Sequence, residues 1–372
     1  MPHFCFITGL YSRYDVLMFE RQGRSLVKAG FKVTYVVCDD KPDELLDGIN
    51  IVSTGFRPQN RKDRFFRTRK VLLKKSLSVD ADVYQISDPE LIGLVSAFKY
   101  RGKSVIFNLR EYYPDMLLGK DYIPAVFRKA MSKGYSRMMK RKLKQYDAVF
   151  VVTDWILDLL RNEYKLDNAY LLANFPVVDN SYVLSKEVYM QRSDTLCYEG
   201  TIYASSKQEN VFKALTKLPN VHYVLAGKIG EGYEWIKKDA YWDQVEFIDG
   251  FKSSELDMIF AKATISNVFR DFGKRDGSLG VLKVFESMAA ALPVLFTDVP
   301  LYQRINQKYH CGICVDPNNE KTIYEAIKYL VENKEQAYEM GQNGRKAVIA
   351  EYNWEKQAEL YLKVINRIIQ KR

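Results

Sequence analysis

The sequence has 372 residues, of which 47% are hydrophobic and 27% are charged. This length exceeds the size at which a single core usually stops growing, so we expect two domains. No stretch approaches the roughly 20 apolar residues of a membrane-spanning helix, and the N-terminus lacks the pattern of a secretory signal. With five cysteines in or beside apolar, strand-like runs, we expect a cytoplasmic protein.

The net charge of +10 is unevenly distributed along the chain. Residues 1–175 hold 30 Lys and Arg against 20 Asp and Glu, whereas the remaining residues hold 26 of each. Such asymmetry is typical of a two-part molecule whose first part meets an anionic partner.

The first part alternates short β-branched or aromatic runs with helical spacing, which predicts a doubly wound parallel sheet. Its expected elements are a strand at 3–10, a helix at 15–30, a strand at 31–40, a strand, loop and helix at 79–102, and strands at 103–113, 146–155 and 169–176. Residues 176–192 are interpreted as a linker.

A second alternating set follows the linker. Strands are expected at 194–200, 221–228, 245–251, 263–269, 293–298 and 311–316, with helices at 207–218, 253–262, 281–292, 320–332, 334–350 and 354–372. We therefore predict a first α/β domain at 1–175, a second at 176–352, and a last helix at 353–372 that crosses back to the first domain. Ligands of open α/β sheets bind at the carboxyl ends of the strands.

A glycine-containing loop, RDGSLG at 275–280, precedes the helix expected over 281–292. A helix N-terminus offers free backbone N–H groups and the positive end of a dipole, which suit a phosphate. Lys283 and Glu286 lie three residues apart on one face of that helix. A carboxylate there can accept hydrogen bonds from the two hydroxyls of a ribose. The alternative is that Lys283 and Glu286 simply lie on a solvent-exposed face of the helix, behind the loop.

Several segments, taken together and in this order, resemble the family-4 retaining glycosyltransferases, which have the GT-B fold of two Rossmann-like domains around a central cleft. The segments are 10–36, VIFNLREYYPDM at 105–116, 149–164, LLANFP at 171–176, CYEGTIYASSKQENVFKAL at 197–215 and SLGVLKVFESMAAALPVLFTD at 278–298. The resemblance implies transfer of a sugar from a UDP- or GDP-sugar, with no metal ion and no other cofactor.

The resemblance assigns roles in the second domain. Glu286 matches the family residue that binds the donor ribose, and Lys207 matches one of two basic residues that bind the diphosphate; Lys283 fits a variant of the same motif. The other basic position is Thr201, and a further family Glu is replaced by Ser278. The donor site would include Gly200, Thr201, Lys228, Gly277, Ser278, Leu279, Gly280 and Val281. Candidate substitutes for the missing cation are Lys228, Arg270, Lys274 and Arg275, with ordinary surface charge as the alternative for each.

The first domain departs further from the family. Its His facing the donor sugar is replaced by Arg110, beside a matching Glu111, while Asp15 is retained. Gly9, Asp15 and Glu111 are expected on the acceptor side. An arginine remains protonated and cannot be a base, but it can hold a phosphate or carboxylate. The alternatives are that Asp15 only caps a helix and that Arg110 and Glu111 form a surface pair.

In this reading, the departing phosphate takes the acceptor proton. Lys207, Lys283, Glu286 and Arg110 are the expected catalytic residues, and Lys207, Lys283 and the amides of 277–280 stabilise the leaving diphosphate. Three alternatives remain open: a nucleotide-sugar epimerase, a non-catalytic GT-B binding subunit, and a nucleic-acid binder. No nucleic-acid partner is expected, because the basic residues belong to no recognised module with interleaved aromatics.

Two basic runs suggest where the acceptor lies. Residues 57–75 carry nine Lys and Arg against one acid, and residues 128–144 carry eight against none. The second run is compatible with a helix that has apolar contacts, and such helices lie on anionic bilayers. We expect peripheral binding to the inner face of the membrane, near a glycan or polyprenyl-linked acceptor of lipid-linked or cell-surface polysaccharide synthesis.

Overall fold

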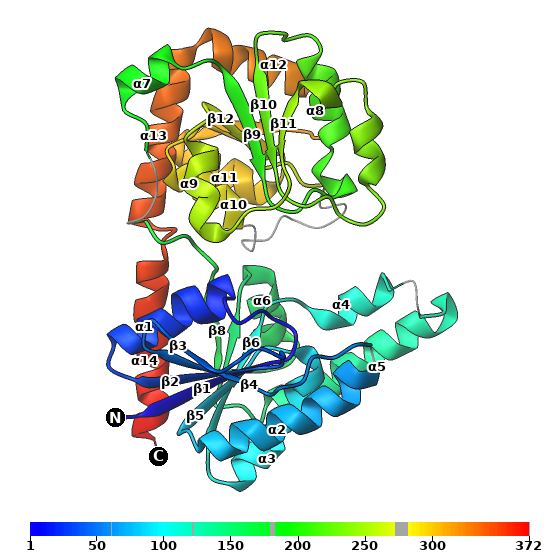
Figure 1. The fold of residues 1–372 in the computed structure, drawn as a ribbon, viewed down its shortest axis with the longest axis vertical. Coiled ribbons are helices and arrows are strands. Elements are labelled where there is room, and N and C mark those ends of the chain that lie inside the picture. The colour runs from blue at the N-terminus through cyan, green and yellow to red at the C-terminus, as the bar shows by residue number, and fades with distance from the viewer. Residues whose placement is uncertain (61, 121–122, 179–182, 272–281, 372) are drawn as a thin grey trace. The chain divides into compact units, whose positions relative to one another are not determined.

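The computed structural model describes residues 1–60, 62–120, 123–178, 183–271 and 282–371. The chain forms two units: Met1–Ala173 with Gln357–Arg372, and Asn174–Lys356. The divisions therefore lie two and four residues from the expected boundaries at 175 and 352. Each unit is an α/β fold with its own sheet (Figure 1), as the alternating pattern predicts.

The sheet of the first unit has the order β3-β4-β2-β1-β5-β6-β7-β8. All neighbouring strands are parallel except β3 and β4. The chain order reverses between β1 and β5, which is a topological switch point. The strands are β1 His3–Thr8, β2 Lys32–Val37, β3 Glu44–Leu46, β4 Ile49–Ser53, β5 Val83–Ile86, β6 Ser104–Leu109, β7 Ala148–Val151 and β8 Ala169–Leu171.

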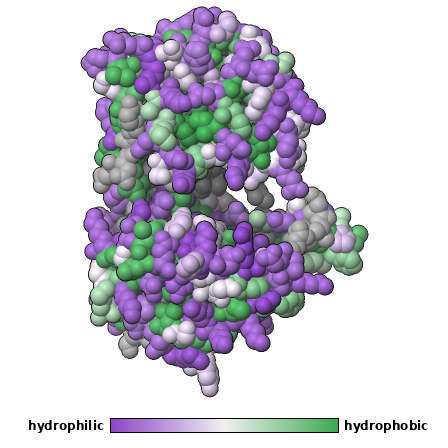
Figure 2. Space-filling view, viewed as in Figure 1, coloured by the Kyte–Doolittle hydropathy of each residue, from purple (hydrophilic) through white to green (hydrophobic). Residues whose placement is uncertain are grey.

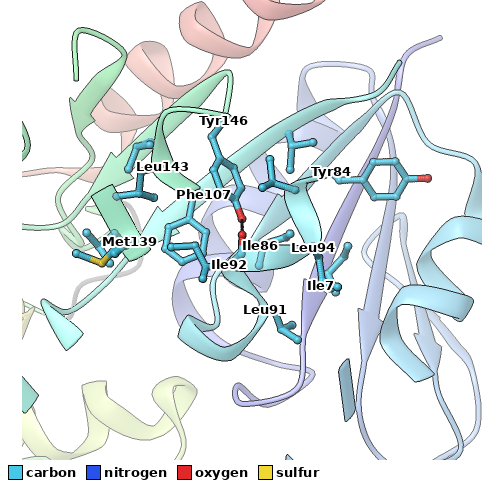
Figure 3. Packing of buried hydrophobic residues seen from close by; sticks show 14 of the residues in the cluster. Ile7, Tyr84, Ile86, Leu91, Ile92, Leu94, Phe107, Met139, Leu143 and Tyr146 are labelled. Atoms are coloured by element: carbon cyan, nitrogen blue, oxygen red, sulfur yellow. Dashed lines mark hydrogen bonds between the residues drawn. The ribbon is translucent and has the colours of Figure 1, made fainter. Parts of the chain in front are cut away.

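Helices cover both faces of this sheet. They are η1 Val16–Gly23, α1 Arg24–Lys28, η2 Asp63–Arg67, α2 Thr68–Val79, η3 Pro89–Leu94, α3 Val95–Tyr100, α4 Tyr113–Leu118, α5 Ala125–Leu143, α6 Asp154–Asn162 and α14 Trp354–Gln370. One face packs against α2, α3, α5 and α6. In this core the Tyr146 hydroxyl donates a 2.7 Å hydrogen bond to the carbonyl of Ile92 (Figure 3).

The opposite face of the first sheet receives α14. The Tyr361 side chain is fully buried and packs on Phe4 and Phe150, with ring centroids 6.5 Å and 5.2 Å away. Its hydroxyl donates a 2.9 Å hydrogen bond to Gln85 Oε1. The helix expected over 354–372 is thus part of the first unit, although it follows the second in sequence.

The second unit has a fully parallel sheet with the order β11-β10-β9-β12-β13-β14. Its chain order reverses between β9 and β12, the position at which dinucleotide-binding sheets hold their ligands. The strands are β9 Thr195–Glu199, β10 His222–Ala226, β11 Val245–Ile248, β12 Ile265–Asn267, β13 Val294–Thr297 and β14 Gly312–Val315.

The helices of the second unit partly match the sequence pattern. They are α7 Lys186–Gln191, η4 Ala204–Ser206, α8 Gln208–Leu215, η5 Glu234–Lys238, η6 Trp242–Gln244, η7 Ser253–Glu255, α9 Leu256–Phe260, α10 Leu282–Ala289, α11 Pro300–Tyr309, α12 Glu320–Glu332 and α13 Lys334–Ala350. The expected linker at 176–192 contains α7, whose first turn is capped by Ser185. The helix expected over 207–218 spans only Gln208–Leu215: it starts after Lys207, which has a left-handed backbone, and it ends three residues earlier than expected.

Candidate functional site

A pocket of about 210 Å³ lies at the switch point of the second unit. Its lining residues come from the end of β9 and the loop that follows it, from the loop after β12, and from α10. The pocket is lined by Tyr198, Thr201, Tyr203, Ser205, Ser206, Phe269, Arg270 and Lys283. The two cationic side chains and the hydroxyl groups in this set suit a phosphorylated ligand.

Lys283 is the cation that α10 contributes to the pocket. Its ammonium lies 3.9 Å from the centroid of the Tyr198 ring, a cation–π contact. A side chain on Gly200 would begin 3.0 Å from the same ammonium, and Gly200 has a φ of 103°. Gly200 therefore leaves the space in which the Lys283 ammonium lies.

Lys207 lies beside the pocket rather than in its lining. It directly follows the lining residue Ser206, with a φ of 52° at the start of α8. Its ammonium is 3.5 Å from Asp271 Oδ2. Both side chains of this ion pair are partly exposed, so solvent screens their attraction and a diphosphate can compete for the lysine.

The remaining donor-side predictions are distributed around this pocket. Thr201 lines it, and its carbonyl accepts a 3.1 Å hydrogen bond from the Tyr198 hydroxyl. Glu286 lies one helical turn beyond Lys283 and is half-buried. Lys228 is exposed on the loop after β10, where its carbonyl accepts a hydrogen bond from the Ile202 amide. Outside the described residues lie Lys274, Arg275, Gly277, Ser278, Leu279, Gly280 and Val281.

Glu199, the last residue of β9, is a polar residue at this site that sequence reasoning missed. The residue is only 5% exposed, and its Oε1 is buried without a hydrogen-bond partner within the described structure. Burial raises the pKa of the Glu199 carboxyl, while the nearby Lys283 ammonium acts in the opposite direction. The only signal in the sequence was a carboxylate at the end of an apolar strand.

The first unit brings Arg110 and Asp15 together. Arg110 Nη1 and Nη2 donate to Asp15 Oδ2 and Oδ1 at 2.9 Å and 3.1 Å, and the guanidinium lies 4.1 Å from the Tyr11 ring centroid. Asp15 Oδ1 also caps η1 by accepting hydrogen bonds from the amides of Leu17 and Met18. Arg110 thus pairs with Asp15, and the alternative of a surface pair with the exposed Glu111 is wrong.

A second carboxylate that the sequence did not reveal lies at the switch point of the first unit. Asp88 is buried, and it accepts hydrogen bonds from the Thr8 hydroxyl at 2.7 Å and the Gly9 amide at 2.6 Å. Thr8 Oγ1 in turn accepts hydrogen bonds from the backbone amides of Leu10 and Tyr11. Asp88 therefore holds the loop after β1, which carries Gly9 of the predicted acceptor side. Burial raises the pKa of Asp88 to about 7.

We expect Asp88→Asn to flatten the dependence of stability on pH between about pH 4 and about pH 7. The pKa of Asp88 is higher in the folded chain than in the unfolded chain, so the folded state binds the proton more tightly. Stability should then fall as pH rises through this window, by up to about 1.4 kcal/mol per unit. Urea unfolding of both proteins at several pH values measures the slope, and equal slopes would contradict the assignment.

Two family models match the chain. The model described as Glycosyltransferase Family 4 matches residues 18–174, and the model described as Glycosyl transferases group 1 matches residues 189–347. An uncharacterized glycosyltransferase of Methanocaldococcus jannaschii is 23% identical over 181 residues, which cover 47% of this chain and 45% of that relative. This match therefore spans less than half of the relative's length.

Several solved structures resemble the chain over nearly its whole length. Sucrose-phosphate synthase from Thermosynechococcus elongatus has a TM-score of 0.76 at 16% identity, with 100% of both chains covered. Anabaena HepE in complex with UDP and glucose has a TM-score of 0.69 at 10% identity, covering 99% of this chain and 100% of that one. WaaG, a glycosyltransferase involved in lipopolysaccharide biosynthesis, has a TM-score of 0.69 at 14% identity, covering 97% and 99%.

These structural likenesses concern the fold, which is GT-B, as the sequence predicted. The first model ends at residue 174, next to the division between the two units, and the second begins at residue 189, so that each covers most of one unit. The chain belongs to the family-4 glycosyltransferases of the GT-B fold.

Proposed function

We propose that the protein is a retaining, metal-independent glycosyltransferase that moves a sugar from a nucleotide-diphosphate sugar to a glycan acceptor. The observation that carries this proposal is the pocket at the β9–β12 switch point, lined by Lys283 and adjoined by Lys207. HepE, which shares the fold, has been solved with UDP and glucose. UDP-sugars are therefore the first donors to test.

The proposed chemistry follows from the charges around the pocket. As the bond between sugar and diphosphate breaks, negative charge grows on the leaving phosphate, and cations fixed in the pocket stabilise it. Lys283 and Lys207 supply this charge, and Glu286 accepts hydrogen bonds from the ribose. In the first unit, Arg110 stays protonated in its pair with Asp15, so it orients groups and does not remove protons. The acceptor proton goes to the departing phosphate.

A panel of UDP-, GDP-, ADP- and CMP-sugars tests the donor assignment by thermal shift. A donor that binds the folded state raises its melting temperature. We expect one nucleotide class to do so, and we expect Glu286→Ala to weaken its binding about tenfold or more, because a charge-assisted hydrogen bond is lost. An unchanged affinity in Glu286→Ala would contradict the ribose role. Turnover of the sugar nucleotide without any acceptor would favour an epimerase.

We also propose that the first unit binds an anionic membrane surface, near a polyprenyl-linked acceptor. Exposed apolar residues accompany the basic runs: Phe66 on η2 is 78% exposed and Val126 on α5 is 80% exposed. Phe65, Phe127 and Met131 are exposed beside them. In Figure 2, apolar atoms appear at the end of the first unit where Figure 1 places the first turns of α5. Apolar side chains among Lys and Arg are typical of interfacial helices.

Within the described residues, no helix is long and apolar enough to cross a bilayer. The proposed attachment depends on surface charge, at about 1 kcal/mol for each Lys or Arg near the lipid. WaaG, which shares the fold, acts in lipopolysaccharide biosynthesis. A membrane-held acceptor is consistent with that likeness.

Charge reversal at Arg137, Arg141 and Lys144, which are exposed on or just after α5, should reduce co-sedimentation with anionic liposomes. The matched control reverses three exposed lysines of the second unit, Lys237, Lys238 and Lys262. We expect binding of the unaltered protein to rise with anionic lipid content and to fall with salt. Equal losses in both variants, or binding that ignores lipid charge and salt, would contradict the proposed surface.

A further inference from the structure

Glu199 is an exception among the well-buried carboxylates of the described chain. Asp88 accepts two hydrogen bonds, and Asp15 accepts hydrogen bonds from the Arg110 guanidinium and from two backbone amides. Glu199 Oε1 is buried and has no donor among the described residues. Leaving a carboxylate oxygen buried without a donor is costly, and buried polar atoms in native proteins usually have a hydrogen-bond partner.

The position of Glu199 supplies the explanation. It ends β9, the strand beside the switch point, and its chain neighbours Tyr198 and Thr201 line the pocket. The residue after it, Gly200, is the one whose missing side chain leaves room for the Lys283 ammonium. The carboxylate therefore lies at the end of the sheet where a ligand is expected to bind.

Lys283 is close enough to act electrostatically on Glu199, yet its described contact is with the ring of Tyr198. The lysine and the glutamate thus do not pair directly with one another in the structure. A ligand that carries both an anionic group and a hydroxyl group satisfies both, because the anion pairs with the ammonium and the hydroxyl donates to the carboxylate.

We propose that Glu199 is a donor-binding residue, and that a hydroxyl of the donor, on its ribose or on its transferred sugar, donates a hydrogen bond to the Glu199 carboxylate. This assignment rests on the proposed function, since it takes the pocket at the switch point as the donor site. It adds a carboxylate contact that complements the cation Lys283 at the same strand end.

The test compares Glu199→Gln with the unaltered protein by calorimetric titration of UDP-glucose and of UDP. Glutamine keeps the size of the side chain and removes its charge. We expect the affinity for UDP-glucose to fall about tenfold or more, the value of a charge-assisted hydrogen bond. A loss of affinity for UDP-glucose alone identifies a hydroxyl of the transferred sugar as the hydrogen-bond donor to Glu199. An equal loss of affinity for UDP identifies a hydroxyl of the ribose.

The direction of the change in affinity distinguishes a direct hydrogen bond between Glu199 and the ligand from an indirect electrostatic effect through Lys283. If Glu199 acted only as a negative charge near Lys283, its removal would leave the cation freer for the diphosphate, and UDP affinity would rise. An unchanged or increased affinity for both ligands therefore overturns the proposal. Failure of the unaltered protein to bind any nucleotide sugar in the panel would instead overturn the proposed function, and this assignment with it.

Thermal unfolding gives a second readout. Glu199→Gln should raise the melting temperature of the donor-free protein, because a neutral amide costs less to bury than a carboxylate, and it should reduce the further rise that UDP-glucose produces. Glu246→Gln is the matched control, because Glu246 lies on β11 in an exposed ion pair with Lys262. A lowered melting temperature with an unchanged response to UDP-glucose would show a structural role and overturn the assignment.

Discussion

Replacing Lys283 by alanine should lower turnover roughly 100- to 1,000-fold while the protein stays folded, because removal of one fixed electrostatic contact to a leaving oxyanion has effects of that size. The Lys283 ammonium lines the pocket and lies on the ring of Tyr198. The contact with the Tyr198 ring contributes about 1 kcal/mol to folding, and the ammonium also acts electrostatically on the buried Glu199 carboxyl. The measurement is kcat with the donor that the panel identifies, together with the melting temperature.

Lys237 provides a matched control for this substitution. Its ammonium also lies over an aromatic ring, 5.1 Å from the centroid of Phe247, but it is not among the residues that line the pocket. Lys237→Ala should therefore cost a similar small amount of stability and leave turnover unchanged. If the two variants lose the same activity, or if Lys283→Ala loses activity only in proportion to unfolded protein, Lys283 does not act on the diphosphate.

Tyr361→Ala should reduce the free energy of unfolding by about 3–5 kcal/mol, the usual cost of removing a large buried aromatic side chain. The ring is fully buried against Phe4 and Phe150, so its loss leaves a cavity beneath α14. The hydroxyl also donates to Gln85 Oε1, and the Gln85 Nε2 amide donates to Gln22 Oε1 at 2.8 Å. Urea unfolding followed by circular dichroism measures the change.

Tyr361→Phe separates the two contributions. It keeps the ring and removes only the donor to Gln85, so we expect a smaller loss, about 1–3 kcal/mol for a buried acceptor left without its partner. A loss of less than about 1 kcal/mol in Tyr361→Ala would mean that α14 contributes little to the first unit.

Long periodic segments of this sequence predict their structure well. The helices expected over 320–332 and 334–350 have those bounds in the structure, because their apolar residues recur over three or more turns. The helix expected over 15–30 instead contains π-type turns over Val16–Gly23 before α1 begins. Helical spacing alone does not distinguish these two hydrogen-bond patterns.

Site residues that belong to a sequence motif could be predicted, whereas residues that only the tertiary fold brings together could not. The sequence singled out Lys283 and Thr201, and both line the pocket. It did not predict the Arg110–Asp15 pair, whose members are 95 residues apart. Asp88 and Glu199 were missed for a related reason: a carboxylate becomes notable only when its burial and its hydrogen-bond partners are known.

The first unit is assembled from two separated pieces of chain, residues 1–173 and 357–372, with the whole of the second unit between them. A ribosome therefore delivers every residue of the second unit before it delivers the helix that covers Phe4 and Phe150. The second unit can complete its fold as soon as it emerges, in the way that domains usually fold during synthesis. The first unit is synthesised earlier, but the apolar face that α14 covers stays uncovered until this helix has been made. During translation that face is therefore exposed to chaperones and to aggregation.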